Sequence, residues 1–227
     1  MAEFDVTIKI LSPIHLSSGQ ANVNIDTEIV HDALGFPYFP AKRFKGLLYE
    51  SVLEVFEMFE LSGLSTENLS PHELIFHRKS SSDVQLIVPN FYIRPADEYE
   101  KFCAEWKYLK GKYPEIFTTA EILNAFTSIR YQTELKDGVA AKGSLHNMRV
   151  LDSDINIFGD KGIKFFGKVT LLNDDDKVLN VLALAIKNLS SAGMKRNRGF
   201  GRIECTATFG KGLTAESIVK KFFAKET

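Results

Sequence analysis

The 227-residue sequence contains little cysteine and no long apolar run. Its two cysteines, Cys103 and Cys205, lie far apart and neither belongs to a Cys-x-x-Cys pair, which argues against a zinc site and against a disulfide-stapled secreted fold. No apolar stretch approaches the length of a membrane span, and the first residues do not resemble a signal peptide. We therefore expect a soluble protein in a reducing, cytoplasmic setting, with no membrane partner.

The chain also lacks an excess of either charge. Its formal net charge is −1, so the molecule as a whole cannot recruit a polyanion, and a nucleic-acid-binding surface would have to be a local cluster of cations. The length and a hydrophobic content of 44% allow a substantial core. The patterns below favour one domain over residues 1–227 with an insertion at 95–162.

Several catalytic motifs are missing as well. The five histidines show no metal-ligand spacing, because His72 and His77 are five residues apart and would face different sides of a helix. The sequence contains no Walker loop and no nucleophile elbow. These absences leave little support for histidine-held metals, P-loop nucleotide hydrolysis or serine-hydrolase chemistry.

Hydrophobic periodicity predicts an alternation of strands and helices. Residues 4–11 alternate apolar and polar side chains, as in a half-buried strand. Pro40 suits the start of a helix, and apolar residues then recur at helical spacing to about Phe59. Residues 84–93 are rich in strand formers, but Pro89 restricts them to an edge strand or a broken one.

The second half begins with an insertion and then repeats the pattern. Thr118, Thr119 and Glu121 predict a capping box before a short helix, and the segment 130–158 has no sustained period. After it we expect a strand at 163–172, a helix capped by the acids at 174–176 and ended at Gly193, and a closing strand at 202–209. This order predicts an α+β fold with a ferredoxin-like β-α-β-β-α-β core, as in the RNA recognition motif, and a large insertion made of a helical segment and the thumb-like segment 130–158.

Cations and glycines alternate in the loop before the closing strand. The glycines let backbone N–H groups approach an anion, and forked guanidinium donors match the geometry of phosphate. A basic turn without a ligand is the alternative from this segment alone. The residues concerned are Gly193, Lys195, Arg196, Arg198, Gly199, Gly201 and Arg202.

This loop also begins like the signature of the RNA recognition motif. Arg198 to Gly201 fit its first four positions, but Arg202 and Cys205 stand where the motif needs stacking aromatic rings. We therefore reject a standard RNA recognition motif and keep RNA as the expected ligand.

A second basic element lies at the start of the first predicted helix, within Phe36 to Gly46. Cations at a helix N-terminus oppose its dipole and favour a bound anion. The segment resembles the Pro-x-x-Pro-Gly-Ser-Ser-hydrophobic-Lys-Gly motif of the RAMP superfamily, the ferredoxin-like subunits of CRISPR effector complexes. The glycine-rich loop is the second hallmark of that superfamily, the segments 12–16 and 24–32 resemble those before the helix motif, and residues 132–145 are similar to the thumb hairpin of type III backbone subunits.

The resemblance implies a backbone subunit of a type III CRISPR ribonucleoprotein that binds the guide RNA. Its implied partners are guide RNA, target RNA, other effector subunits and further copies of itself. Asp26 occupies the place of the family aspartate that cleaves target RNA, where a carboxylate would act on the ribose 2′-hydroxyl or hold a divalent cation, expected to be Mg²⁺ and not tightly bound. An ordinary solvated loop acid is the alternative, with His31 and Asp32 as nearby competitors. His31 reads as a strand-end surface residue, and Asp32 is expected to shape the turn before Gly35.

The resemblance also implies a set of RNA-binding residues. Leu145 and Met148 of the thumb would wedge against displaced bases or, equally, pack inside the insertion, and Phe200 is expected in the core. The implied RNA-binding residues are Lys42, Arg43, Lys45, Gly46, Lys195, Arg196, Arg198, Gly199, Gly201, Arg202, Leu145 and Met148.

Two departures from the family pattern keep other roles open. Ala41, Lys42 and Arg43 replace the usual Gly-Ser-Ser, and Ser17 and Ser18 replace paired glycines after His15. These bulkier residues favour a different backbone contact and raise the alternative of a non-catalytic scaffold subunit in the same complex. A guide-processing endoribonuclease with His15 or His31 as its catalytic histidine is a further, weaker alternative.

Overall fold

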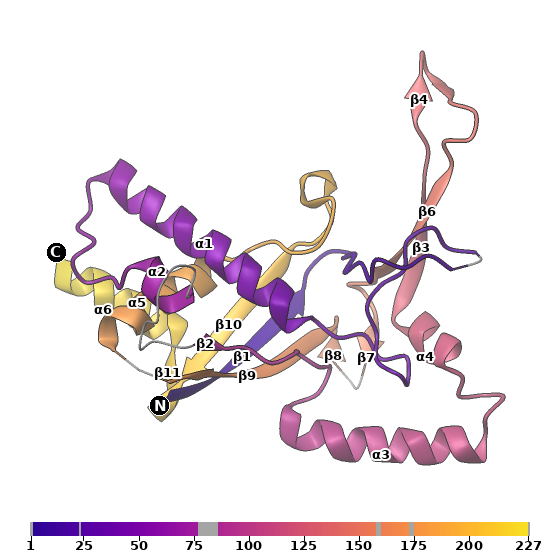
Figure 1. Ribbon diagram of the computed structural model, residues 1–227, viewed down its shortest axis with the longest axis horizontal. Helices are drawn as coiled ribbons and strands as arrows, with labels where there is room; N and C mark the ends of the chain where they lie inside the picture. Colours follow the sequence, from indigo (N-terminus) through magenta and orange to yellow (C-terminus); the bar gives the residue numbers. More distant parts are fainter. Residues whose placement is uncertain (1, 23, 77–85, 158–159, 173–174, 227) are drawn as a thin grey trace.

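The centre of the molecule is an antiparallel sheet with helices on one face (Figure 1). The computed structural model describes every residue except 1, 23, 77–85, 158–159, 173–174 and 227, so the predicted positions Val84, Asp174, Phe158 and His77 lie outside the described residues. The sheet has the strand order β11-β10-β1-β9-β2. Its strands are β1 (Ala2–Ile10), β2 (Leu86–Ile87), β9 (Lys164–Leu171), β10 (Ile203–Phe209) and β11 (Leu213–Thr214).

The alternation that predicted the first strand separates the two faces of the sheet. Phe4, Val6 and Ile8 of β1 are buried, and Val6 pairs with Ala207 of β10 and Gly167 of β9. The opposite face is polar, with Glu3, Asp5, Thr7, Glu204, Thr206 and Thr208. The described part of these two strands therefore offers no aromatic platform for bases, which agrees with rejection of a standard RNA recognition motif.

Helices α1 (Ala41–Ser62), α5 (Asp176–Asn188) and α6 (Ala215–Glu226) pack together against the sheet, and the short α2 (His72–Phe76) contacts α1. The predicted first helix is confirmed: Pro40 is its N-cap and Gly63, in the left-handed region, ends it. Asp175 caps α5 as predicted. The expected end at Gly193 is wrong, because Leu189 already leaves the helical conformation. Gly193 instead lies against His15, whose carbonyl oxygen would be 2.8 Å from an added Cβ.

The strand expected at 84–93 is short and broken. Among its described residues only β2 is a strand, and beyond Pro89 the chain forms two isolated bridges, Phe39 with Phe91 and Tyr92 with Phe166. A proline cannot donate to a ladder, which explains the break.

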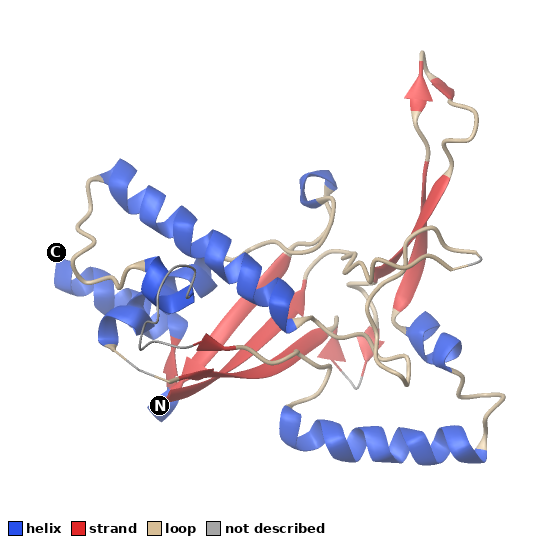
Figure 2. Ribbon diagram, in the orientation of Figure 1, coloured by secondary structure: helices blue, strands red, loops and turns tan. Residues whose placement is uncertain are grey.

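The insertion carries two helices and a projecting hairpin. Helix α3 (Ala96–Lys112) runs along one side of the molecule, and α4 (Thr119–Ala125) starts at Thr118, whose hydroxyl accepts the Glu121 N–H as predicted. The hairpin of β3 (Thr127–Gln132) and β6 (His146–Leu151) extends away from the sheet, and we call it the thumb (Figures 1 and 2). The remaining strands are β4 (Leu135–Lys136), β5 (Val139–Ala140), β7 (Asn156–Ile157) and β8 (Asp160–Lys161).

Candidate nucleic-acid interface

Segments that are distant in the sequence meet at the base of the thumb. These are the loop 12–31 after β1, strand β6, the glycine-rich loop 192–202 with its 3-10 turn Arg196–Arg198, and the first turn of α1. Thr27 forms a parallel bridge with Met148, and Ile14 an antiparallel bridge with Leu151, so the loop runs along the edge of β6.

Asp26 lies at this edge, on the surface. Its backbone N–H donates to Asn147 Oδ1 at 2.8 Å, and its Oδ2 accepts the backbone N–H of Asn147 at 2.7 Å. Asn147 also donates to the carbonyl of Asn24. The carboxylate is therefore held in place by β6, while Oδ1 accepts no hydrogen bond from any residue that the structure describes.

A histidine of the thumb faces the same carboxylate. His146 Nδ1 lies 3.9 Å from Asp26 Oδ2, and both side chains are exposed, by 72% and 56%. In the thumb ladder His146 pairs with Gln132 of β3. The side chain of Gln132 in turn donates to the sulfur of Met148 at 3.3 Å.

A buried ion pair lies beneath Asp26. Arg149 Nε is 2.7 Å from Glu28 Oε1, and each residue is only 8% exposed. The contact is a close ion pair without a well-aligned hydrogen bond. Arg149 NH1 also donates to Asn124 Oδ1 and Thr127 Oγ1. Glu28 lies two residues after Asp26 in the loop, and Arg149 lies two residues after Asn147 in β6. The ion pair therefore links this loop to the strand that holds Asp26.

His15 is wholly buried beside this pair. Its Nδ1 donates to the Arg149 carbonyl at 2.6 Å, and Nε2 has no partner in the described part of the chain. Burial lowers the pKa of His15 most, and the nearby cations Arg43 and Lys195 lower it further. His15 is therefore a neutral, structural side chain.

The glycine-rich loop contacts both the thumb and α1. Lys195 adopts the left-handed conformation and its Nζ donates to Gln132 Oε1. Arg196 NH1 lies 3.6 Å from Glu50 Oε2 of α1. Gly201 permits the loop to close, since its φ is +76° and an added Cβ would lie 1.9 Å from the Ala192 carbonyl oxygen. Arg198 and Arg202 are exposed, and Phe200 is half-buried.

The cations of the first turn of α1 point in different directions. Lys42 is exposed, whereas half-buried Arg43 donates from NH2 to the Ser17 carbonyl and has a buried NH1 without a partner among the described residues. Burial lowers the pKa of Arg43. Lys45 turns away to the Leu86 carbonyl at β2. Gly46 is exposed, with nothing within 4 Å of an added Cβ.

The two thumb residues expected to wedge against bases differ. Leu145 is 66% exposed, but Met148 is only 4% exposed. The wedge role does not fit the buried Met148, whose sulfur accepts a hydrogen bond from Gln132 and whose backbone bridges Thr27; it packs between the insertion and the loop 12–31.

The competitors of Asp26 have structural roles. Asp32 Oδ1 accepts the N–H groups of Leu34, Gly35 and Phe36, which confirms its expected role in the turn. Its Oδ2 accepts the Tyr99 hydroxyl at 2.6 Å, and burial with this contact raises the pKa of Tyr99. His31 forms an isolated bridge with Pro37, as expected at a strand end, and is half-buried, with Nδ1 at the Asp32 carbonyl.

Sequence reasoning missed the residues that assemble this interface. Glu28 and Gln132 lie in segments that resemble the family, but neither these two nor His146, Asn147 and Arg149 were assigned a role. Arg149 stands between the apolar residues Met148 and Val150, which is the one local signal that its side chain is unusual for a surface position. Nothing in the sequence pairs it with Glu28 across more than a hundred positions.

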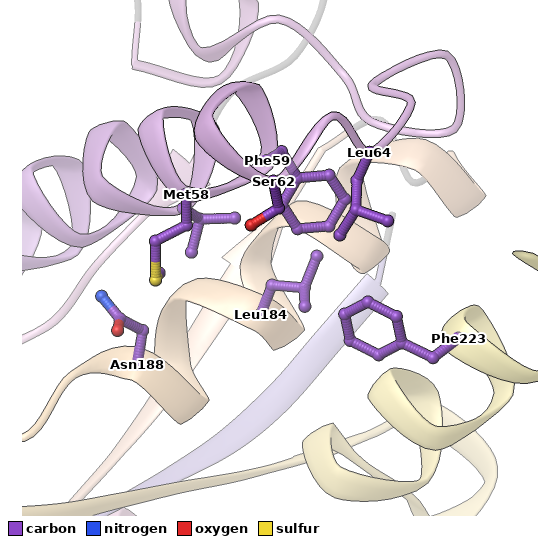
Figure 3. A pocket seen from close by; sticks show the side chains of 8 residues that line it. Met58, Phe59, Ser62, Leu64, Leu184, Asn188 and Phe223 are labelled. Atoms are coloured by element: carbon purple, nitrogen blue, oxygen red, sulfur yellow. The ribbon is translucent and has the colours of Figure 1, made fainter.

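A metal site and other ligand sites were also considered. The described residues contain no group of three or more His, Cys, Asp or Glu side chains that could hold a metal ion. A hollow of about 260 Å³ lies between α1, α5 and α6, away from Asp26, and its lining is apolar except for Ser62 and Asn188 (Figure 3). It lacks the convergent polar groups of a catalytic pocket. Within the described part of the chain, no helix is both long enough and apolar enough to cross a membrane.

Two solved structures are similar to this fold. The chain is similar to a chain of the cryo-EM structure of type III-B Cmr-beta bound to cognate target RNA, with 12% identity and a TM-score of 0.59 over 96% of this chain and 98% of that chain. It is also similar to a chain of type III-B Cmr-beta in its apo state, with 13% identity and a TM-score of 0.58 over 92% and 97% of the two chains.

These likenesses show the fold, a mixed α+β fold with antiparallel sheets. No curated protein matches the chain. The model of the RAMP superfamily matches residues 7–204, which include Asp26, the first turn of α1 and the glycine-rich loop. The match spans most of the sequence and both basic elements, so the protein belongs to the RAMP superfamily.

Proposed function

We propose that this chain is a guide-RNA-binding backbone subunit of a type III CRISPR ribonucleoprotein, and that it cleaves target RNA paired to the guide through Asp26. The observation that carries the proposal is the convergence, at the base of the thumb, of Asp26 with the glycine-rich loop and the start of α1. Its implied partners are guide RNA, target RNA, other effector subunits and further copies of itself. The similar Cmr-beta chains come from such an assembly, in one case with target RNA.

The proposed role includes a ferredoxin-like core within a single domain over residues 1–227. The four core strands follow one another along the chain as β1, β2, β9 and β10. In the sheet they lie in the order β10-β1-β9-β2, which is fourth, first, third and second along the chain, and each neighbouring pair is antiparallel. This order supports the β-α-β-β-α-β assignment, with residues 95–162 as its insertion. The two cysteines are free thiols, which supports a reducing, cytoplasmic setting.

In this proposal the guide backbone lies over the exposed cations of the two basic elements. Lys42, Arg198 and Arg202 are exposed and would supply charge. Arg43 and Lys195 are anchored to the Ser17 carbonyl and to Gln132, so they would provide pre-positioned donors. Gly46 leaves open space on α1 between Arg43 and Glu50, where a ribose-phosphate chain can approach the helix.

Asp26 would act as a general base. Its carboxylate is fixed by Asn147 and exposes Oδ1, which can accept the proton of a ribose 2′-hydroxyl. The described side chains here do not form a protein-held metal site, so a divalent ion such as Mg²⁺ would take most of its ligands from RNA phosphates and water. When bound, such an ion would neutralise charge on the scissile phosphate.

One observation favours a non-catalytic scaffold as the second candidate. The reciprocal hydrogen bonds between Asp26 and Asn147 fasten the loop to β6, and a purely structural aspartate would make the same contacts. Guide processing loses support because His15 is wholly buried and His31 half-buried, so neither is presented to RNA.

Target cleavage by the guide-loaded complex tests the catalytic role. We expect Asp26→Ala to abolish the regularly spaced cuts seen with wild type, while guide binding remains intact. Glu57→Ala removes an exposed carboxylate on the far half of α1 and should cut normally. Unchanged cutting by Asp26→Ala would make this chain a scaffold.

The salt dependence of guide binding tests the RNA-binding surface separately. Lys42→Ala or Arg198→Ala should each reduce the slope of log affinity against log salt by about 0.7, the value for one contact to single-stranded RNA. An unchanged slope for both variants would remove these cations from the RNA path. A backbone role also requires several copies of the chain per guide, which native mass spectrometry of the purified complex would count.

A further inference from the structure

We propose that His146 is the second catalytic residue of this site, the general acid that protonates the leaving oxygen when target RNA is cut. This inference rests on the proposed function, because it requires Asp26 to be the base. It adds a residue that carries no sequence motif and lies 120 positions from Asp26.

The first observation is the geometry of the two side chains. His146 Nδ1 lies 3.9 Å from Asp26 Oδ2, and the two side chains remain mostly exposed to solvent. An imidazole whose Nδ1 faces a carboxylate presents its other ring nitrogen, Nε2, to a substrate. The pair therefore offers a free carboxylate oxygen, Oδ1, and a separate N–H donor at one exposed place.

The second observation is that strand β6 of the thumb holds both partners in place. Asp26 is fixed by the main chain and side chain of its neighbour Asn147, and His146 lies in the ladder of the thumb opposite Gln132. Gln132 accepts a hydrogen bond from Lys195 of the glycine-rich loop. The ladder thus places His146 beside Asp26 and opposite Gln132, which binds a cation that can balance phosphate charge.

The chemical step balances with these two groups. Asp26 Oδ1 accepts the proton of the 2′-hydroxyl, O2′ attacks phosphorus, and the bond from phosphorus to O5′ breaks as the O2′–phosphorus bond forms. His146 Nε2–H donates its proton to O5′. The products are a 2′,3′-cyclic phosphate and a 5′-hydroxyl end, and both side chains regain their starting states by exchanging one proton with water.

The test compares two target RNAs in guide-loaded wild-type and His146→Gln complexes. One target is ordinary RNA, and the other carries sulfur in place of the 5′-oxygen at a mapped cut site. A thiolate leaves without protonation, because thiols are far more acidic than alcohols. We expect His146→Gln to cut ordinary RNA about 10²- to 10⁴-fold more slowly, the usual contribution of a general acid, and the sulfur-containing target within a few-fold of wild type.

The control is His72→Gln, which alters a histidine on α2 that contacts Glu73, outside the site. It should behave as wild type on both targets. Wild-type cutting of ordinary RNA by His146→Gln, or equal slowing on both targets, would overturn the role of His146 while leaving the proposed function intact. Normal cutting by Asp26→Ala would instead overturn the proposed function, and this inference with it.

Discussion

Replacement of Glu28 by Gln should destabilise the chain strongly, because it leaves the Arg149 guanidinium buried without an anion. Both residues are 8% exposed and their charged groups lie 2.7 Å apart. Removal of one partner of a buried pair costs about 3–5 kcal/mol. Arg149 retains two neutral acceptors, Asn124 and Thr127, so we expect the lower end of that range. At about 2–4 °C per kcal/mol for a chain of this size, the Tm should fall by about 6–12 °C.

Thermal unfolding followed by the fluorescence of Trp106, the single tryptophan, measures this change. Glu57→Gln, on the exposed side of α1, is the matched control and should leave the Tm nearly unchanged. Replacing both Glu28 and Arg149 by Met should restore much of the loss, because an apolar pair carries no uncompensated charge. A Tm within about 2 °C of wild type for Glu28→Gln would refute the argument that the pair is buried and structural.

Three further predictions concern the same surface. Gly46→Ala should stabilise the free chain by about 0.5–1 kcal/mol, because alanine has the higher helix propensity. The same change should weaken guide binding, because the added methyl group occupies the open space where RNA approaches α1; denaturant unfolding measures the gain in stability and binding isotherms measure the loss of affinity. Gly199→Ala, in open space, should cost about 1–2 kcal/mol from its positive φ alone, whereas Gly201→Ala should cost clearly more because its Cβ meets the Ala192 carbonyl; paired Tm measurements compare them. Burial lowers the pKa of His15 in the folded chain, so the histidine binds a proton more readily in the unfolded chain. Acidification from pH 7.5 to 5.5 should therefore lower the free energy of unfolding once the pH falls below about 6.5, by at most about 1.4 kcal/mol per pH unit. A His15→Asn variant should show a flatter pH dependence of its Tm.

Local patterns predicted the regular elements well. The alternation in β1 and the helical spacing after Pro40 come from residues that must bury one face, so they are visible in a short window. The end of α5 was misplaced at Gly193. Gly193 has a left-handed backbone conformation, as a glycine that ends a helix would, but here the glycine allows a close tertiary contact with His15.

The thumb shows why other elements could not be read in the same way. Its tip is exposed on both faces, so β4 and β5 have no apolar period that would mark them as strands. Met148 has the composition of a wedge residue, but the loop 12–31 and Gln132 cover it. Burial at this position depends on segments far away in the chain.

The sequence by itself determined the order of the core strands and helices up to β10, the two basic elements and the position of Asp26, because these depend on neighbouring residues and on short motifs. Only the tertiary structure decided which side chains surround Asp26. Strand β6 brings His146 and Asn147 beside it, and the buried pair of Glu28 and Arg149 fixes that register. Contacts between segments separated by more than a hundred residues arise from chain folding around a common core, and no local pattern encodes them.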